Sequence, residues 1–198
     1  ATSHFSWRNN NMSVYKAFEH QHVPEIKQSL KQLQNSFDAE IDFIPYRGDF
    51  PRGIFATLVV KTKVALEEIV RMYEEYYAKD SFVHIVDKNI DLKQVVNTNK
   101  CLIHLEKHGD KLLIISCIDN LLKGASGQAV HNMNLMFNLE ETVGLRRSQI
   151  ADRFQSHRPF LPQATTLAVT RREKIEAVDG LAQALHQAGV VDGRENGE

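Results

Sequence analysis

The sequence predicts an α+β (mixed α/β) fold in which a mixed, mostly antiparallel sheet carries helices on one face. It contains short apolar runs of strand length and other stretches with apolar residues at helical spacing. Two further apolar runs, 101–106 and 111–117, flank the turn His108-Gly-Asp110, which is typical of an antiparallel hairpin. Because strands and helices mix along the chain around a hairpin, α+β or mixed α/β is the expected class.

Length and composition indicate a globular protein. The chain has 198 residues, of which 42% are hydrophobic and 25% charged. The net charge of −1 gives no electrostatic case for nucleic acid or an anionic membrane, and no apolar run approaches the roughly 20 residues of a membrane span. No signal peptide is evident, so we expect a cytoplasmic protein. We expect Cys101 and Cys117 to be reduced core residues.

The first half of the chain is expected to alternate short strands with helices. Residues 12–15 are expected to form a short strand, and a helix is expected from Pro24 to about residue 35. Proline suits the first turn of a helix, and Glu25 suits the positive end of the helix dipole. Residues 41–44 and 53–62 are expected to be strands, the second a nearly continuous apolar run suited to a buried position.

The elements that follow are predicted from their periodicity. A helix is expected over 64–77, then a strand over 82–86, then the hairpin, then a helix beginning near Gly127. The apolar face of the first helix carries Leu66, Ile69, Val70 and Tyr73. The last helix is expected to bury Val130, Met133 and Phe137.

A change in composition near Leu145 predicts a domain boundary, with one domain over 1–145 and a separate segment over 146–198. Before the boundary there are 12 Lys and 4 Arg, and after it there are 1 Lys and 7 Arg. The second segment is expected to be a polar linker followed by one amphipathic helix, with a capping box at Thr170 and Glu173. One such helix is too little to fold alone, so we expect a docking or fused element.

Small residues and one lysine precede the last predicted helix. The run Gly124-Ala-Ser-Gly127 lets the backbone approach a ligand closely, and the first N–H groups of a helix have no partners inside it. Such a helix start attracts anions, and Lys123 adds a positive charge beside it. The alternative is an ordinary glycine–serine turn ahead of an amphipathic helix.

His20, His22 and Glu25 form a second candidate group. On a strand, His20 and His22 would project from the same face, and Glu25 could hold one imidazole in a fixed tautomer, an arrangement that suits a general base. The pair also resembles part of a zinc site. Such a site needs at least three protein ligands, and no third is evident, so no metal is expected. Surface histidines without a function are the alternative.

Two arginines bracket a loop and form a third candidate group. Arg47 and Arg52 could clamp a carboxylate or phosphate as bidentate donors, although solvated loop arginines are equally plausible. The sequence holds no dinucleotide fingerprint after a strand, no nucleophile elbow and no P-loop.

Taken together, these segments resemble the N-acetyl-gamma-glutamyl-phosphate reductases. His-Gln-His-Val-Pro-Glu-Ile at 20–26 resembles that family's His-x-His-x-Pro-Glu-Ile motif, and Phe-Pro-Arg-Gly-Ile-Phe-Ala-Thr at 50–57 resembles its Arg-Gly-Ile strand. Val-Asn-Thr-Asn-Lys-Cys at 96–101 and the long motif over 120–137 follow in the family order. The resemblance covers 1–145. It implies the substrate and dimerisation part of the enzyme, with the fold of the C-terminal domain of the glyceraldehyde-3-phosphate-dehydrogenase-like reductases.

The resemblance also implies a reaction. The family reduces N-acetyl-glutamyl phosphate, or a close N-acyl analogue, to the semialdehyde in arginine biosynthesis, with NADPH and a cysteine thioester. The resemblance implies a homo-oligomer as well. His20 would be the base partner of the cysteine and Glu25 its orienting carboxylate, and His22 and Arg52 would lie at the substrate. Near the cofactor domain would lie Asn120, Lys123, Gly124 and Gln128.

The departures from the family pattern lead to further expectations. The Gly-x-x-Gly-x-x-Gly and Asn-Pro-Gly-Cys motifs would both precede Ala1, so we expect NADP to bind a missing N-terminal half and the isolated chain to be inactive. Gln21 stands where the family commonly has arginine. The ending of 146–198 resembles the start of a phosphotransferase-system enzyme IIA domain, without its phosphorylated histidine. The alternative functions are a non-catalytic self-associating module and a His-x-His metal hydrolase.

Overall fold

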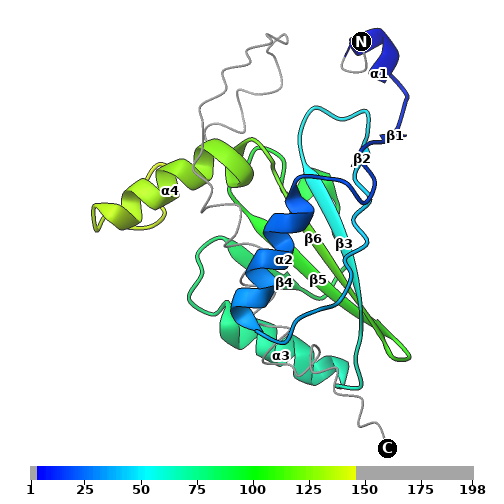
Figure 1. The fold of residues 1–198 in the computed structure, drawn as a ribbon. Coiled ribbons are helices and arrows are strands. Elements are labelled where there is room, and N and C mark those ends of the chain that lie inside the picture. The colour runs from blue at the N-terminus through cyan, green and yellow to red at the C-terminus, as the bar shows by residue number, and fades with distance from the viewer. Residues whose placement is uncertain (1–3, 146–198) are drawn as a thin grey trace, which may run out of the picture.

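The computed structural model describes residues 4–145, so the linker and helix expected over 146–198 lie outside the described residues. The main sheet has four strands in the order β3-β6-β5-β4 (Figure 1). These strands are β3 (Ile54–Lys61), β4 (Val83–Val86), β5 (Cys101–His108) and β6 (Lys111–Ile118). β3 and β5 both run antiparallel to β6, and β4 runs parallel to β5. The predicted α+β class with a mixed, mostly antiparallel sheet is therefore confirmed.

The β5–β6 hairpin forms the centre of the sheet. Its turn contains Gly109 with φ +63°, a left-handed conformation that glycine adopts without a steric penalty. Leu112, Ile114 and Cys117 of β6 are fully buried. The predicted hairpin is confirmed. Because it has a neighbouring strand on each side, it supplies most of the buried apolar side chains of the described residues.

One face of the sheet is covered by α3 (Leu66–Tyr76). Successive side chains on a strand point to opposite faces, so Ile103, Leu105 and Ile114 lie on the same face and contact α3. The helix buries Ile69 and Tyr73 completely in this core. The apolar stripe predicted for residues 64–77 is thereby confirmed.

The opposite face of the sheet is covered only in part. A segment containing the 3-10 helix η1 (Leu92–Gln94) packs against Leu102, Ile115 and Cys117. Towards the edge strand β3, the side chain of Val59 is 67% exposed and Phe55 is also exposed. The prediction of a buried position for residues 53–62 is therefore wrong, because β3 lies at the edge and one of its faces has no cover within residues 4–145.

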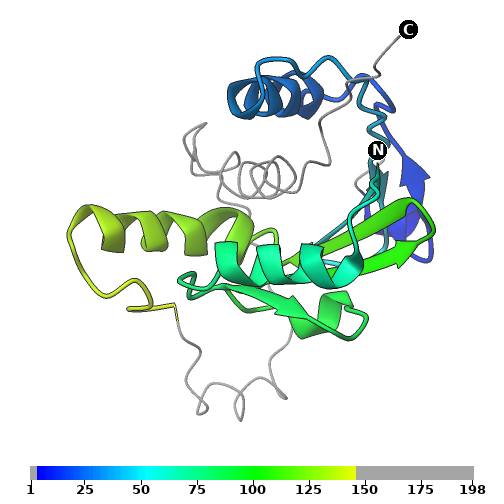
Figure 2. The ribbon, with the colours of Figure 1, turned by 90° about the horizontal axis from the view of Figure 1, so that it is seen from below.

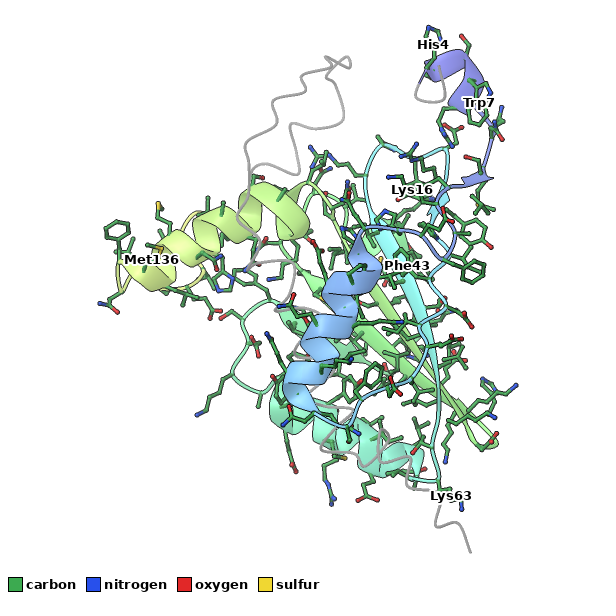
Figure 3. The ribbon with its side chains drawn as sticks, viewed as in Figure 1. His4, Trp7, Lys16, Phe43, Lys63 and Met136 are labelled. Atoms are coloured by element: carbon green, nitrogen blue, oxygen red, sulfur yellow. The ribbon has the colours of Figure 1, made fainter. Side chains whose placement is uncertain are left out.

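The helix α4 (Gly127–Met136) follows directly on the π-helix η2 (Leu122–Ser126). Its buried side chains are polar, namely those of Gln128, His131 and Asn134. The expected burial is wrong for Met133, which is 45% exposed, and for Phe137, which is 70% exposed; Val130 is half-buried. The polar side chains hydrogen-bond locally and to the loop after the helix, so the apolar side turns outward, as Met136 shows (Figure 3).

The N-terminal region forms a separate small unit. It contains α1 (Phe5–Arg8), α2 (His22–Leu33) and a two-stranded antiparallel sheet of β1 (Ser13–Val14) and β2 (Tyr46–Arg47). α2 stands apart from the main sheet, on the side of α3 and α4 (Figure 2). The strand predicted over 41–44 is wrong. That segment makes only isolated hydrogen bonds, and regular pairing with β1 begins after Pro45.

Candidate functional site

His20 and His22 lie in a bend at the entrance to α2, and not on a strand. The backbone N–H of His22 donates a hydrogen bond to Nδ1 of His20 over 3.2 Å. The expected strand geometry is wrong because the chain turns into the helix at His22. The two imidazoles still meet, edge to face, with centroids 4.5 Å apart. The His20 side chain, one position before the N-cap residue Gln21, thus accepts a hydrogen bond from the first residue of α2.

Two aromatic rings enclose the His20 imidazole, which is 8% exposed. The ring centroid of Tyr15 lies 5.5 Å from it, and that of Phe43 lies 5.2 Å from it. The bend before His20 contains Lys16 at φ +46° and Phe18 at φ +63°. Left-handed conformations of residues other than glycine are unfavourable and gather at functional sites, so this strained bend is consistent with a site built around His20.

Glu25 lies in the first turn of α2, as the sequence predicts. Its side chain is half-buried, and the described residues show no hydrogen bond between Glu25 and His20. The ring nitrogen Nδ1 is instead held by the backbone N–H of His22. The group that fixes the tautomer of His20 is therefore the backbone N–H of His22, which the sequence pattern did not suggest.

The two candidate arginines are held by different partners. The Arg47 guanidinium lies over the Tyr15 ring at 4.1 Å, which places it next to the group that encloses His20. Nη1 of Arg52 instead contacts Oδ2 of Asp119 at 3.3 Å. The described residues therefore show no shared clamp of Arg47 and Arg52.

Asp119 is a buried organising residue that the sequence analysis missed. Besides Arg52, its carboxylate accepts hydrogen bonds from the backbone N–H groups of Asn97 at 2.7 Å, Leu121 at 2.8 Å and Leu122 at 3.0 Å. Burial acts to raise the pKa of this carboxyl, but these donors outweigh burial and hold the pKa below its usual range. An acidic residue just before a helix start is the signal for such a cap.

The helical run that follows begins at Leu121–Leu122 and not at Gly127, because η2 precedes α4. Since Asp119 accepts from both of those N–H groups, a carboxylate of the protein itself occupies the positive end of the run. The neighbouring Asn120 Oδ1 accepts a hydrogen bond from the Gly53 N–H at 2.7 Å, which ties the end of β6 to the start of β3.

Lys123 and Gln128 are brought together. Nζ of Lys123 donates to Oε1 of Gln128 over 2.7 Å, and Nε2 of Gln128 donates to Oδ1 of Asn132 over 3.2 Å.

Gly124 makes ordinary contacts, whereas Gly127 leaves no room for a side chain because Asn99 packs against it. Asn99 is buried, and neither polar atom of its amide has a hydrogen-bond partner in the described structure. Asn99 lies in the motif at 96–101, but the motif alone suggests no role for it; the signal comes from its buried position.

Neither cysteine has the properties of a nucleophile. Cys101 and Cys117 are free and buried, as the sequence predicts. Burial raises the pKa of the Cys101 thiol, and burial together with the neighbouring Cys101 raises the pKa of Cys117 to about 11. Both are therefore protonated near neutral pH, and the reactive form is the thiolate.

Among residues 4–145 there is no group of three His, Cys, Asp or Glu side chains that could hold a metal ion. No helix of this part of the chain is long and apolar enough to cross a membrane.

A mixed four-stranded sheet and an enclosed histidine motif are the main features of this domain. Comparison with known proteins identifies the family to which it belongs. The family model described as "semialdehyde dehydrogenase, dimerisation domain" matches residues 1–120. The chain therefore belongs to this family.

Individual relatives agree with the motif resemblance, which is thereby confirmed. The chain is 97% identical over 146 residues to the N-acetyl-gamma-glutamyl-phosphate reductase of Bacteroides thetaiotaomicron, a match that covers 74% of this chain and 45% of the relative. Identity to the protein of the same name from Phocaeicola vulgatus is 92% with the same coverage. For that from Methanothrix thermoacetophila, identity is 41%, covering 73% of this chain and 44% of the relative. The chain thus spans somewhat less than half the length of these relatives.

Proposed function

We propose that this chain is the substrate-side and dimerisation part of an NADPH-dependent reductase that converts N-acetyl-glutamyl phosphate, or a close N-acyl analogue, to the semialdehyde in arginine biosynthesis. The observation that carries the proposal is the enclosed imidazole of His20, the first residue of the His-x-His-x-Pro-Glu-Ile motif, directly after a strained bend at Lys16 and Phe18. The names of the high-identity relatives support the same reaction.

In this proposal the candidate residues divide between two places. His20 is the acid–base residue that serves a cysteine supplied by the rest of the enzyme, with His22 beside it at the substrate. Glu25 remains a candidate orienting group that would need to rotate towards an imidazole. Arg52 is the candidate for the substrate anion. Nη1 of Arg52 already contacts Asp119. A guanidinium carries five N–H donors, so it can bind a second partner as well.

The described residues fit a phosphate cradle poorly. Asp119 occupies the N–H groups at the start of the helical run, and Lys123 is engaged by Gln128. We therefore propose that the principal NADP site lies in the part of the enzyme that this chain does not match, where the cofactor would supply hydride. Asn120, Lys123, Gly124 and Gln128 would then meet the cofactor domain from outside, together with the exposed apolar side of α4.

We also propose that two copies associate through the uncovered face near β3. Phe55 and Val59 lie exposed there beside the half-buried Leu113 of β6. An apolar sheet face of this kind marks an interaction site, and the family takes its description from dimerisation. Val59→Asp should convert a dimer to monomers in sedimentation velocity, while Lys61→Asp at the rim should have a much smaller effect.

Two further parts of the proposal concern place and extent. We propose that the enzyme acts in the cytoplasm, and that residues 146–198 form a linker-and-helix element separate from 1–145. The composition change at Leu145 supports the second part.

The reaction is tested by joining this chain to the remaining part of a relative and measuring NADPH-dependent reduction. His20→Asn should lower turnover by about 10²–10⁴-fold, the range for losing acid–base help, and His22→Asn clearly less. Asparagine also carries a side-chain oxygen, so His20→Asn removes the imidazole while keeping a possible acceptor for the His22 N–H. His108→Asn, on the exposed hairpin turn, is the control. Equal losses at positions 20 and 22 would contradict the assignment.

A further inference from the structure

The entrance to α2 contains an aromatic residue, Phe43, whose position has no evident structural purpose. It lies in the segment 41–45, which forms no strand, and its side chain is only half-buried. Its ring nevertheless lies against both histidines of the motif, 5.2 Å from the His20 centroid and 6.4 Å from that of His22.

The backbone holds Phe43 at this place. The N–H of Phe18 donates to the carbonyl oxygen of Phe43 over 2.8 Å, and the N–H of Tyr15 donates to that of Pro45 over 3.1 Å. These bonds attach the segment to both ends of the strained bend that leads to His20. Phe43 and the imidazole are therefore fixed relative to each other through two connections, one of backbone and one of ring contact.

The His20 ring has one nitrogen engaged and one open. Nδ1 accepts the His22 N–H, so in the neutral imidazole the proton is on Nε2. Nε2 makes no hydrogen bond with the described residues. With Tyr15 and Phe43 on its sides, the ring cannot turn over without losing the bond to the His22 N–H.

We propose that Phe43 is a positioning residue for His20: its ring, together with the His22 N–H, holds the imidazole in the Nε2–H tautomer and leaves Nε2 as the nitrogen that meets the reacting groups. In its resting state His20 then presents an N–H donor, which suits a thiolate or a developing oxyanion. In this tautomer Nε2 already carries a proton. His20 can therefore take up a proton at Nε2 only after the ring has changed to the Nδ1–H form, which breaks the hydrogen bond from the His22 N–H. This inference rests on the proposed function for its catalytic meaning, but the tautomer itself is a property of this chain.

The tautomer is tested on the full chain by long-range ¹H–¹⁵N correlation spectra of the histidine rings, with His20 assigned from the His20→Asn spectrum. The wild type should show the Nε2–H form of His20 in about tenfold excess or more at a pH where the ring is neutral, a ratio that corresponds to about 1.4 kcal/mol. A mixture of tautomers, or an excess of Nδ1–H, would overturn the proposal without any variant.

Variants then isolate Phe43. Phe43→Leu should reduce the excess to about threefold or less, and Phe43→Tyr, which keeps the ring, should restore it. Phe37→Leu is the matched control, because Phe37 is also half-buried in the same connecting segment and makes no ring contact with His20 in the described structure. An unchanged ratio in Phe43→Leu, or an equal loss in Phe37→Leu, would contradict the role given to Phe43.

Activity of the chain joined to the rest of a relative separates this inference from the proposed function. Phe43→Leu should lower kcat by about tenfold with little change in KM, and Phe43→Tyr should recover it. If His20→Asn leaves turnover unchanged while the tautomer results hold, the proposed function fails and the positioning of His20 stands. If His20→Asn abolishes turnover and Phe43→Leu leaves kcat and the tautomer ratio as in the wild type, the inference alone fails.

Discussion

The helices α3 and α4 lie on the same side of one sheet and use opposite kinds of surface. α3 buries Ile69 and Tyr73 in an apolar core. α4 buries Gln128, His131 and Asn134 and leaves Met136 and Phe137 exposed. A helix that buries its apolar side is complete within its domain, whereas one that buries its polar side has an apolar surface left for another partner.

The attachment of α4 consists mainly of polar bonds. Nε2 of His131 donates to Glu141 over 2.7 Å, and Glu141 also accepts a bond from the Ser81 hydroxyl at 2.6 Å. Nδ2 of Asn134 donates to the carbonyl oxygens of Glu141 at 3.1 Å and Val143 at 2.9 Å. Hydrogen bonds fix orientation but contribute less net stability than apolar burial. We therefore expect α4 to be well oriented and weakly held until its apolar side is covered.

The largest effect is expected in the core under α3. Ile69→Ala should lower the free energy of unfolding by about 2–5 kcal/mol, since it removes buried methyl groups and leaves a cavity. Urea unfolding followed by circular dichroism measures this. Leu135→Ala, on the exposed side of α4, should change the same quantity by less than about 0.5 kcal/mol. Similar losses at both positions would remove the contrast between the helices.

A smaller loss is expected on the polar side of α4. Asn134→Ala should cost about 1–3 kcal/mol, because two carbonyl oxygens lose their buried donor. The change should also speed amide hydrogen exchange in residues 138–145 while exchange in α3 stays unchanged. Faster exchange in α3 instead would show that the two helices unfold together.

Acid should loosen α4 before α3. Burial acts to raise the pKa of Glu141, but the Ser81 and His131 hydrogen bonds and the nearby Lys123 charge hold it below its usual range; Asp119 behaves in the same way. A carboxyl with a lowered folded pKa stabilises the protein above its ordinary pKa of about 4, and this stability is lost as pH falls through the folded value. Between about pH 5 and pH 3, exchange in α4, corrected for its intrinsic pH dependence, should rise about tenfold relative to α3. In Asp119→Asn this response should be reduced.

The smallest effect in the isolated chain is expected at the exposed end of α4. Phe137→Ser should change the free energy of unfolding by less than about 0.5 kcal/mol. In the chain joined to the remaining part of a relative, the same change should cost about 1.5–3 kcal/mol, the value of burying a phenylalanine. Thermal unfolding of both forms measures the difference. An effect of equal size in both would show that the α4 surface stays open in the complete enzyme.

The contrast between the helices also explains which buried faces could be predicted from the sequence and which could not. The period of Ile69 and Tyr73 predicts α3 and its buried face, because apolar side chains there meet the sheet of the same domain. In α4 the same reasoning selects Met133 and Phe137, since an apolar period indicates that a face will be covered but does not say by what. Polar networks give a weaker signal still. Asp119 is one acidic residue after an apolar strand, and two of the four partners of its carboxylate, Arg52 and Asn97, lie far from it in sequence.

The candidate site shows a similar division. The family motif identified His20 and His22, and the structure brings their rings together. The ring of Phe43 could not be foreseen, because a segment without regular strand pairing delivers it, and the left-handed turns at Lys16 and Phe18 occur at residues that do not usually adopt them. Local patterns identify the reactive groups, whereas long-range placement decides which of their atoms are available.

The order of strands also has a consequence for folding during synthesis. β5 and β6 are consecutive and joined by a tight turn, so their pairing needs little loop-closure entropy. β3 is made much earlier, yet within residues 4–145 its one partner in the main sheet is β6, the last of the four strands to emerge. On a ribosome adding roughly 5–20 residues each second, β3 therefore waits for seconds with its apolar side chains unpaired. Until β6 emerges, this early strand is open to aggregation, and a chaperone could protect it there.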